Sequence, residues 1–532
     1  MMKASAAGSA ESRWRDRFLN GVERLGNALP DPVAIFVIII ALLMAVSAIA
    51  AGQGWAATNP VTGERLVAKS LFSEELVRQL FTEMPKTYTG FTPLGLALTI
   101  ILGAGVAEQS GLLSTLLRRS MQGVPDRLLV PTVILIGMLT VHAIDAGYLV
   151  YIPLAGLIFA NAGRNPVLGI ILGFVGCSTG LAGNLLPGQY DVLILGITQT
   201  GARLLDPGWE MNPLGNWWFL IAIATAFVAL GWLITEKVVG PRLGPWQAHG
   251  EGISPVPEAI DSAQRRGLRA AGLVAIIIWL AAAALVFAPG YSPFYDRAAA
   301  ASQRIVPFYR SLAALLFLLM LGSGWAYGKA AGTIASHRDV VSMMAKGLEG
   351  LLPYLVLAFF AAHFVAMFGW SNLAPITAIK GAAVLRELDA PPALLLPLLT
   401  TASAWLDFLI ASGSAKWTAM APVTVPMLML LDVSPEMTTA AYRVGDTVTN
   451  LISPLNAYFV LTLIFCQRWL PTMRLGTLLS ATLPYAVAFY LAGAVIVASW
   501  VALDLPLGPG TQVTYKLLGQ SVTPQFVEPP NR

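Results

Sequence analysis

Long apolar runs alternate with short polar segments along most of the chain. Seven runs hold about 20 residues or more, the length that an α-helix needs to cross the hydrocarbon core of a bilayer. These runs lie at about 33–52, 93–116, 216–236, 268–289, 308–328, 350–370 and 475–503. The pattern predicts an all-α polytopic membrane protein. The first run is long enough to be retained as a spanning helix rather than cleaved as a signal peptide.

Two further zones, 127–200 and 391–466, are apolar overall but are interrupted by Gly, Pro, Asn, Asp, Ser and Lys. The interruptions come too often for ordinary spanning helices. Broken backbone at membrane depth is tolerated only where it is buried in protein or lines a cavity. We therefore expect each zone to form a re-entrant hairpin followed by a broken helix. One such zone in each half is typical of inverted repeats with a binding site between them.

The two zones also match each other in sequence. Residues 142–153 in the first half correspond in spacing to residues 411–422 in the second half. A second pair of matching segments follows, at 184–188 and 450–454. Because both pairs occur in the same order and at nearly the same separation, we interpret the two halves as inverted repeats.

The distribution of basic residues predicts the orientation in the membrane, because Lys and Arg crowd cytoplasmic loops. The basic N-terminal segment and the basic linker between the halves are both placed in the cytoplasm. With one hairpin in each half, about nine spanning helices then leave the C-terminus outside, and the two hairpins enter from opposite faces. The expected division begins with a cytoplasmic N-terminal segment 1–30 and a first half 31–236, which contains hairpin 1 at about 127–161 and a broken helix at about 165–200. A cytoplasmic linker 237–267 leads to the second half 268–504, which contains hairpin 2 at about 391–431 and a broken helix at about 440–466. The extracytoplasmic tail is 505–532.

Composition supports the membrane assignment and excludes several functions. Hydrophobic residues make up 56% of the 532 positions and charged residues only 12%, about half the charged fraction of a soluble domain. The net charge of +4 comes without a basic run of the kind that binds nucleic acid. Two cysteines and four scattered histidines give neither a disulfide framework nor a metal-binding spacing. No hydrolase, kinase or metalloprotease motif is present, so we do not expect an enzyme.

Five charged residues stand out within the interrupted zones. A charge in the membrane interior is unfavourable by roughly 2.5–3.5 kcal/mol on insertion scales, so such residues usually face a cavity or a partner. Arg443 and Asp446 are three positions apart and so share one helical face. They form either a structural ion pair or a site in which Arg443 binds a substrate carboxylate while Asp446 orients it. The full set is Asp145, Asp191, Asp407, Arg443 and Asp446.

The segment from Ser412 to Trp417 resembles a hairpin tip, since its small residues let the backbone approach a ligand closely. Ser414, which corresponds to Asp145 in the other half, is therefore a candidate for ligand binding. Trp417 could stack on an aromatic substrate or anchor the protein at the membrane interface. Lys416 could extend to that interface and is not counted as a ligand.

Asn184 and Asn450 mark the two helix breaks, where backbone carbonyls are freed. Oxygen ligands suit hard cations, so Asn184, Ser414 and Asn450 form a candidate Na⁺ site. Asp145, Asp191 and Asp407 are further candidates for ion binding or coupling. Asp191 could instead cap a helix. His142 and His363 lie in apolar runs, where a hydrogen-bonded core histidine is the simpler interpretation than a proton shuttle.

Several segments resemble the AbgT family of p-aminobenzoyl-glutamate transporters. They are Glu23-Arg-Leu-Gly-Asn-Ala-Leu-Pro-Asp-Pro32, Ala143-Ile-Asp-Ala-Gly-Tyr148, Ser412-Gly-Ser-Ala-Lys-Trp417 and Ala441-Tyr-Arg-Val-Gly-Asp-Thr-Val-Thr-Asn-Leu-Ile-Ser-Pro454, and the resemblance covers about 20–504. It implies a homodimer of nine-helix, two-hairpin subunits in the bacterial inner membrane. It also implies transport of p-aminobenzoyl-glutamate or export of sulfonamide antimetabolites. The positions important for transport in the family fall here on Asp191, Ser414, Trp417, Arg443, Asp446 and Pro454.

The chain departs from the family pattern at a few positions. Asp407 stands where the resemblance leads us to expect Asn, His363 stands where we expect an amide, and Pro187 and Gln189 are less typical. An added carboxylate at 407 would strengthen a cation site or create a proton site, so both Na⁺ and H⁺ stay open as the coupling ion. The expected function is cation-coupled alternating access for aromatic carboxylates. The alternative is sodium-coupled uptake of another carboxylate or dicarboxylate.

Overall fold

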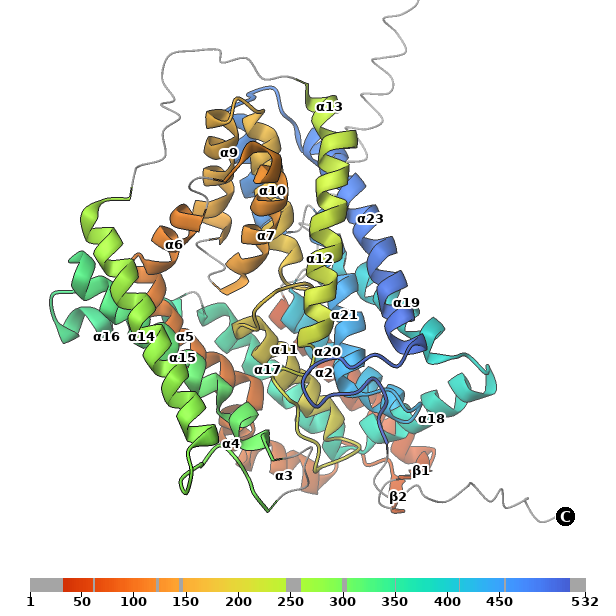
Figure 1. Cartoon of the computed structure of the whole chain (residues 1–532). Helices are drawn as coiled ribbons and strands as arrows, with labels where there is room; N and C mark the ends of the chain where they lie inside the picture. The colour runs from red at the N-terminus through yellow and green to blue at the C-terminus, as the bar shows by residue number, and fades with distance from the viewer. Residues whose placement is uncertain are drawn as a thin grey trace, which may run out of the picture.

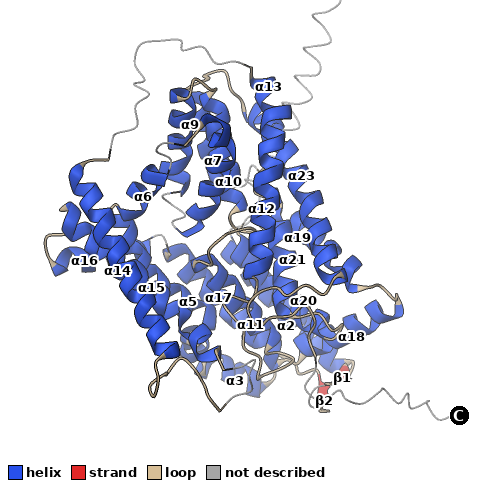
Figure 2. Ribbon diagram, in the orientation of Figure 1, coloured by secondary structure: helices blue, strands red, loops and turns tan. Residues whose placement is uncertain are grey.

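The structure is a computed structural model in which almost all regular structure is helical (Figures 1 and 2). It describes residues 32–60, 63–120, 124–142, 147–244, 260–298, 304–349, 351–410, 412–453 and 456–516. Within these ranges the strands are β1 (Ala56–Thr58) and β2 (Arg65–Val67), which form one antiparallel pair. Asp145, Pro454 and the N-terminal segment 1–30 lie outside the described residues.

Seven helices of the described chain are long and apolar enough to cross a membrane, and each coincides with one of the predicted runs. The prediction of a helical polytopic membrane protein is therefore confirmed. Helix α12 (Trp217–Ile234) continues through a π-helical turn into α13 (Gly240–Leu243), and the two together count as one span. The other six are α2 (Pro32–Gly52), α5 (Thr92–Gln109), α14 (Ser262–Phe287), α15 (Val306–Ala331), α17 (Leu352–Trp370) and α23 (Leu475–Ala502).

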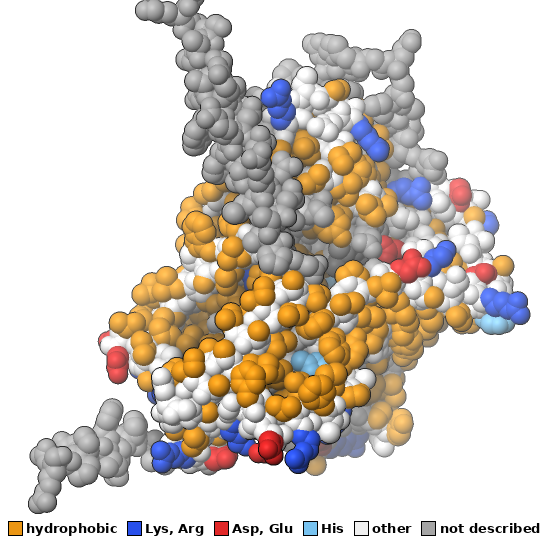
Figure 3. All heavy atoms as spheres, turned by 180° about the vertical axis from the view of Figure 1, so that it is seen from behind, with side chains coloured by type: hydrophobic (Ala, Val, Ile, Leu, Met, Phe, Trp, Pro, Cys, Tyr) orange, Lys and Arg blue, Asp and Glu red, His pale blue; other side chains and the backbone are white. Residues whose placement is uncertain are grey.

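The outer faces of these helices carry apolar side chains that a soluble protein would bury. On α14, Leu273, Ile276 and Leu280 are each about 60% exposed. In the space-filling view, hydrophobic side chains cover the middle of the molecule and charged ones lie mainly near its edges (Figure 3). This is the surface expected where acyl chains, not water, surround the helices.

The second predicted span is shorter than the sequence suggested. Helix α5 ends at Gln109, and Gly111 takes a φ of +88°, a conformation that an L residue rarely adopts. The chain then turns into a separate helix, α6 (Leu112–Ser120), with Arg118 and Arg119 in its last turn. The hydroxyl of Thr115 in α6 lies 2.7 Å from the hydroxyl of Tyr327 in α15.

The described part of each interrupted zone contains four α-helices, and all of them are shorter than the roughly 20 residues that a span requires. In the first half they are α7 (Leu129–Leu139), α9 (Ile152–Asn161), α10 (Pro166–Thr179) and α11 (Gln189–Ala202). In the second half they are α19 (Pro392–Asp407), α20 (Gly413–Met429), α21 (Pro435–Thr449) and α22 (Ala457–Gln467). Helix α10 packs against both α7 and α9, and α21 packs against both α19 and α20.

Glycines allow these short helices to pack backbone against backbone. A Cβ atom at Gly137 in α7 would lie 2.7 Å from the Cα of Gly176 in α10. In the other half, a Cβ at Gly445 in α21 would lie 2.0 Å from the carbonyl oxygen of Thr400 in α19. Small residues at helix contacts are typical of membrane bundles, where close van der Waals packing drives association.

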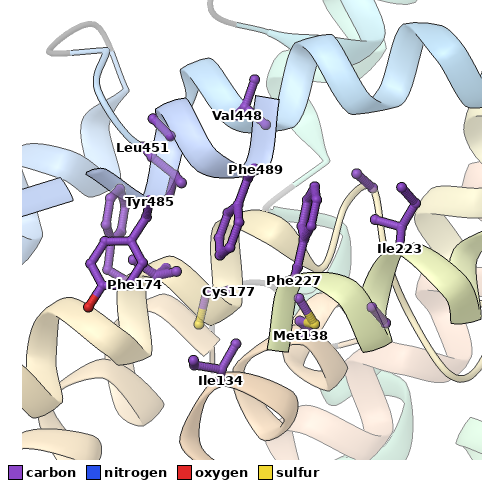
Figure 4. Close-up of a cluster of buried hydrophobic side chains, with 14 of the residues drawn as sticks. Ile134, Met138, Phe174, Cys177, Ile223, Phe227, Val448, Leu451, Tyr485 and Phe489 are labelled. Atoms are coloured by element: carbon purple, nitrogen blue, oxygen red, sulfur yellow. The ribbon is translucent and has the colours of Figure 1, made fainter. Parts of the chain in front are cut away.

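The largest apolar core joins the two halves (Figure 4). Phe227 of α12 stacks on Phe489 of α23 with ring centroids 4.4 Å apart. Nearby, the hydroxyls of Tyr485 and Thr235 lie 2.8 Å apart. Ile134, Phe174 and Val448 belong to the same core, so α7, α10 and α21 pack around these rings.

Four short helices and a C-terminal segment complete the described fold. The helices are α3 (Glu74–Thr82), α4 (Met84–Thr89), α16 (His337–Glu349) and α18 (Leu373–Glu387). The backbone carbonyls of Leu507 and Val513 accept hydrogen bonds of 2.8 Å from the amides of Trp218 and Ser434. Tyr515 donates to Asp206 at 2.9 Å. Up to residue 516, the segment predicted to be a tail is therefore packed against the helical body.

Candidate functional site

Five buried charged side chains gather where the broken helix of the first half meets hairpin 2 and the broken helix of the second half. Each is at most 2% exposed. The chain provides them from the first turn of α11, the last residue of α19, the first turn of α20 and the middle of α21. They are Asp191, Asp407, Lys416, Arg443 and Asp446. Of the charged residues singled out in the sequence, this set lacks only Asp145, which is not described.

Arg443 binds across the boundary between the halves. One terminal nitrogen, Nη1, lies 2.7 Å from Oδ1 of Asp191 in α11. These two atoms are in ionic contact but are not aligned for a hydrogen bond. Nε donates a hydrogen bond of 2.8 Å to the carbonyl oxygen of Leu181, which the break between α10 and α11 leaves free of helical pairing, and Nη2 donates to the same oxygen. The guanidinium group thus holds two separate parts of the first broken helix.

The expected contact between Arg443 and Asp446 is not formed. Although the two residues are three positions apart in α21, Arg443 pairs with Asp191, and Asp446 pairs with Lys416 at 2.8 Å. The orienting role that the sequence suggested for Asp446 therefore has no geometric basis in this conformation.

Asp191 both caps a helix and pairs with a charged group, the two roles that the sequence left open. Its Oδ2 atom accepts a hydrogen bond of 2.6 Å from the backbone amide of Gly188, so the side chain caps the start of α11. Its other oxygen contacts Arg443. A carboxylate in the first turn of a helix is also stabilised by the helix dipole. Asp191 therefore holds together the start of α11 and the arginine of the other half.

Lys416 does not extend to the membrane interface, so that alternative is wrong. Its side chain is fully buried, and its Nζ atom lies 2.8 Å from Oδ1 of Asp407 and 2.8 Å from Oδ1 of Asp446. It also donates to the carbonyl oxygen of Ser403 at 3.2 Å. Asp407, the residue that departs from the family pattern, thus has a direct ionic partner in the tip of hairpin 2.

Trp417 is not an interfacial anchor either, because it is completely buried. Its indole ring stacks on the ring of Tyr442 with centroids 4.2 Å apart and an interplanar angle of 25°. Its Nε1 atom donates a hydrogen bond of 2.8 Å to Thr198 in α11. Tyr442 therefore covers one face of the indole ring.

The three residues proposed as Na⁺ ligands each make separate local hydrogen bonds. Asn184 donates to the carbonyl oxygen of Met138 at 3.0 Å, and Asn450 donates to that of Asp446 at 3.1 Å. Ser414 lies 3.5 Å from the hydroxyl of Ser412. Within the described chain, no hydrogen bond joins any two of these three residues.

The two histidines differ in their surroundings. His363 contacts the carbonyl oxygen of Phe359 through Nδ1 at 2.6 Å, as a core histidine does. His142 borders a small pocket. The Nε2 atoms of both histidines have no hydrogen-bond partner in the described part of the protein. The other residues that line this pocket are Ile100, Ala104, Gly188, Gln189, Leu316 and Met320.

Two tyrosines belong to the site but were not selected from the sequence. The hydroxyls of Tyr190 and Tyr442 lie 3.4 Å and 3.3 Å from the carboxylate of Asp446, and Tyr442 also donates to the carbonyl oxygen of Gly413. Each tyrosine directly precedes a charged residue of the site, Asp191 or Arg443, which is the signal that could have identified it. A Cβ atom at Gly413 would lie 2.8 Å from Asp446, so this glycine keeps the hairpin tip close to α21.

Comparisons with known proteins identify relatives of the whole chain. The profile described as the AbgT putative transporter family matches residues 17–515. The p-aminobenzoyl-glutamate transport protein of Escherichia coli (strain K12) is 34% identical over 494 residues, which cover 92% of this chain and 95% of the relative. The Alcanivorax borkumensis YdaH transporter, known from a crystal structure, is 39% identical in sequence to this chain. The two structures align with a TM-score of 0.83 over 90% of this chain and 100% of the YdaH chain. Neisseria gonorrhoeae MtrF, described as illuminating a class of antimetabolite efflux pumps, is 36% identical, with a TM-score of 0.85, and covers 93% of this chain and 100% of its own.

Proposed function

Because the chain belongs to the AbgT transporter family, we propose that it carries aromatic carboxylates of the p-aminobenzoyl-glutamate type, and sulfonamides that share the aminophenyl ring, by cation-coupled alternating access. The observation that carries this proposal is the pairing of Arg443 with groups from the other half of the chain. The names of the relatives support the substrate class, since one transports p-aminobenzoyl-glutamate and another represents antimetabolite efflux pumps.

Arg443 and Trp417 supply the two kinds of contact that such a substrate needs. A planar guanidinium binds a carboxylate through two parallel hydrogen bonds, and an indole ring stacks on an aromatic ring. In this conformation Asp191 contacts the guanidinium and Tyr442 covers the indole. We propose that the substrate carboxylate replaces Asp191 at Arg443 and that its ring replaces Tyr442 on Trp417.

This exchange would couple binding to movement. Asp191 also caps α11, so its release from Arg443 removes one of the contacts that hold the first broken helix against the second. A ligand that binds one arrangement of the halves better than the other shifts the population between them. Alternating access follows when the two arrangements open to opposite sides of the membrane.

We further propose the orientation and assembly expected from the sequence. The protein would lie in the inner membrane as a homodimer, with its N-terminus in the cytoplasm and its C-terminus outside. The basic linker between the halves supports this orientation. Cysteine labelling from each side of sealed vesicles tests the orientation, and cross-linking in lipid tests the dimer.

Counterflow in proteoliposomes is the experiment that tests the substrate. Labelled p-aminobenzoyl-glutamate and a labelled sulfonamide are supplied separately, with pH and Na⁺ gradients imposed one at a time. We expect saturable counterflow that Arg443→Ala abolishes and that Arg164→Ala, which removes a partly exposed arginine, leaves intact. If the folded wild-type protein carries neither compound but takes up a dicarboxylate, the proposed substrate is wrong and the alternative carboxylate transporter replaces it.

A further inference from the structure

The end of α19 and the middle of α21 form a small shell of oxygen atoms of the kind that binds a monovalent cation. Oδ1 of Asp407, Oδ1 of Asp446 and the carbonyl oxygen of Ser403 all lie within 3.2 Å of one point, the Nζ atom of Lys416. The carboxylates are 0% and 1% exposed. Asp407 is the last residue of α19 and Ser403 lies one turn before it, near the helix end where the dipole also favours positive charge.

This shell has the features of an ion site in a carrier with broken helices. In such carriers, freed carbonyls and the C-terminal ends of half-helices coordinate the coupling cation. A second observation points the same way: Oδ2 of Asp407 is buried and has no hydrogen-bond partner among the described residues. Both carboxylates contact the one ammonium, so its removal would leave two buried carboxyl groups without a cation.

The position that an ion would take is held by a side chain of the protein itself. We propose that Lys416 is a tethered cation, whose ammonium takes the place of Na⁺ between hairpin 2 and the broken helix of the second half. The transport cycle therefore needs no Na⁺, and the chain carries its own permanent counter-ion for Asp407 and Asp446. This inference rests on the proposed alternating-access function, because a tethered cation matters only where the two elements move.

Lys416 also explains how the tip of hairpin 2 is held. It is in the first turn of α20, whereas its partners are in α19 and α21, so the ammonium joins three elements at one point. A diffusible Na⁺ could dissociate from this shell in each cycle. The tethered ammonium cannot leave, so its movement is limited to the reach of its own side chain.

Removing the ammonium should create a Na⁺ site. In purified Lys416→Ala, the three oxygens and the vacated space remain, so we expect Na⁺ but not choline to raise the melting temperature. Counterflow by this variant should be at least about tenfold higher in Na⁺ than in choline. For the wild type, both measurements should be the same in the two salts. Lys416→Met, whose side chain refills the space without a charge, should lose activity in both salts.

A second variant covers the case in which Lys416→Ala does not fold. Lys416→Ala/Asp407→Asn removes one charge of each sign but keeps three oxygens, and Na⁺ should again raise its melting temperature. If Na⁺ stabilises neither variant, or if the wild type needs Na⁺ for transport, the inference is overturned. The melting measurement uses no substrate, so it can succeed or fail independently of the proposed substrate class.

Discussion

At the scale of single residues, the ion pair between Arg443 and Asp191 dominates the charge balance of the site. Both side chains are buried, so removal of one leaves the other charge without a partner. Loss of one partner of a buried pair destabilises a protein by roughly 3–5 kcal/mol. We expect Asp191→Asn to lower the melting temperature strongly and to abolish counterflow.

Two further variants separate stability from transport. The double variant Asp191→Asn/Arg443→Gln removes both charges, so it should recover most of the lost melting temperature but no transport. Glu236→Gln, which breaks the partly exposed pair with Arg164, should change the melting temperature little, because such pairs contribute about 0–1 kcal/mol. Full transport by the double variant would show that the pair is only structural.

Trp417 offers a milder test at the same scale. Trp417→Phe keeps a ring that can stack on Tyr442 but removes the hydrogen bond to Thr198. The Thr198 hydroxyl keeps its contact with Thr439 at 2.7 Å, so the loss should be about 0.5–1.5 kcal/mol of stability. We expect Trp417→Phe to bind substrate, measured by scintillation proximity, within a few-fold of wild type, and Trp417→Ala to lose binding. Equal binding by both variants would contradict a stacking role.

At the scale of elements, the contact between α19 and α21 sets the position of the site. A Cβ atom at Gly445 would lie 2.0 Å from the carbonyl oxygen of Thr400, and this backbone contact cannot yield without separating the helices. We expect Gly445→Ala to lower both the melting temperature and counterflow. Gly272→Ala is the matched control, since a Cβ at Gly272 in α14 meets nothing within 4 Å. A Gly445→Ala protein as stable as wild type would show that the two helices can shift apart.

The sequence predicted the long spans well, because a run of about 20 apolar residues has few alternatives to crossing the bilayer. Asn184 and Asn450 do lie at interruptions of helical structure, as expected from their polar, Pro- and Gly-containing surroundings. The partners of the buried charges could not be predicted in the same way. The spacing of Arg443 and Asp446 suggested a contact along one helix, whereas each partner comes from another element. The helix α16 and residues 505–516 were missed because they are too short and too polar to give a membrane signal.

At the scale of the whole molecule, the two halves are held together by contacts of several kinds. The stacked rings of Phe227 and Phe489 join them in the core, the pair of Arg443 and Asp191 joins them at the site, and the C-terminal segment joins them at one end. Burial raises the pKa of Tyr515, so its hydroxyl stays protonated as the donor to Asp206. The packed segment is therefore part of the fold and not an appendage.

Truncation tests this conclusion. A chain that ends at Asp504 loses three buried apolar side chains, Leu507, Val513 and Tyr515, along with the hydrogen bonds to Trp218 and Ser434. Burial of each side chain stabilises the fold by about 1.5–3 kcal/mol, so the free energy of unfolding should fall by several kcal/mol. We expect a clearly lower melting temperature, whereas a chain that ends at Lys516 keeps all of these contacts and should match the full-length protein. Equal melting of the two truncated chains would contradict the proposed role of the segment.

The same segment imposes an order on biosynthesis. Residues 505–516 leave the ribosome after every helix described here, yet they supply the acceptors for backbone amides at the starts of α12 and α21. Those two helix ends therefore lack these acceptors until residues 505–516 have been synthesised. A polypeptide that is stopped before residue 505 lacks the acceptors for the backbone amides at both places.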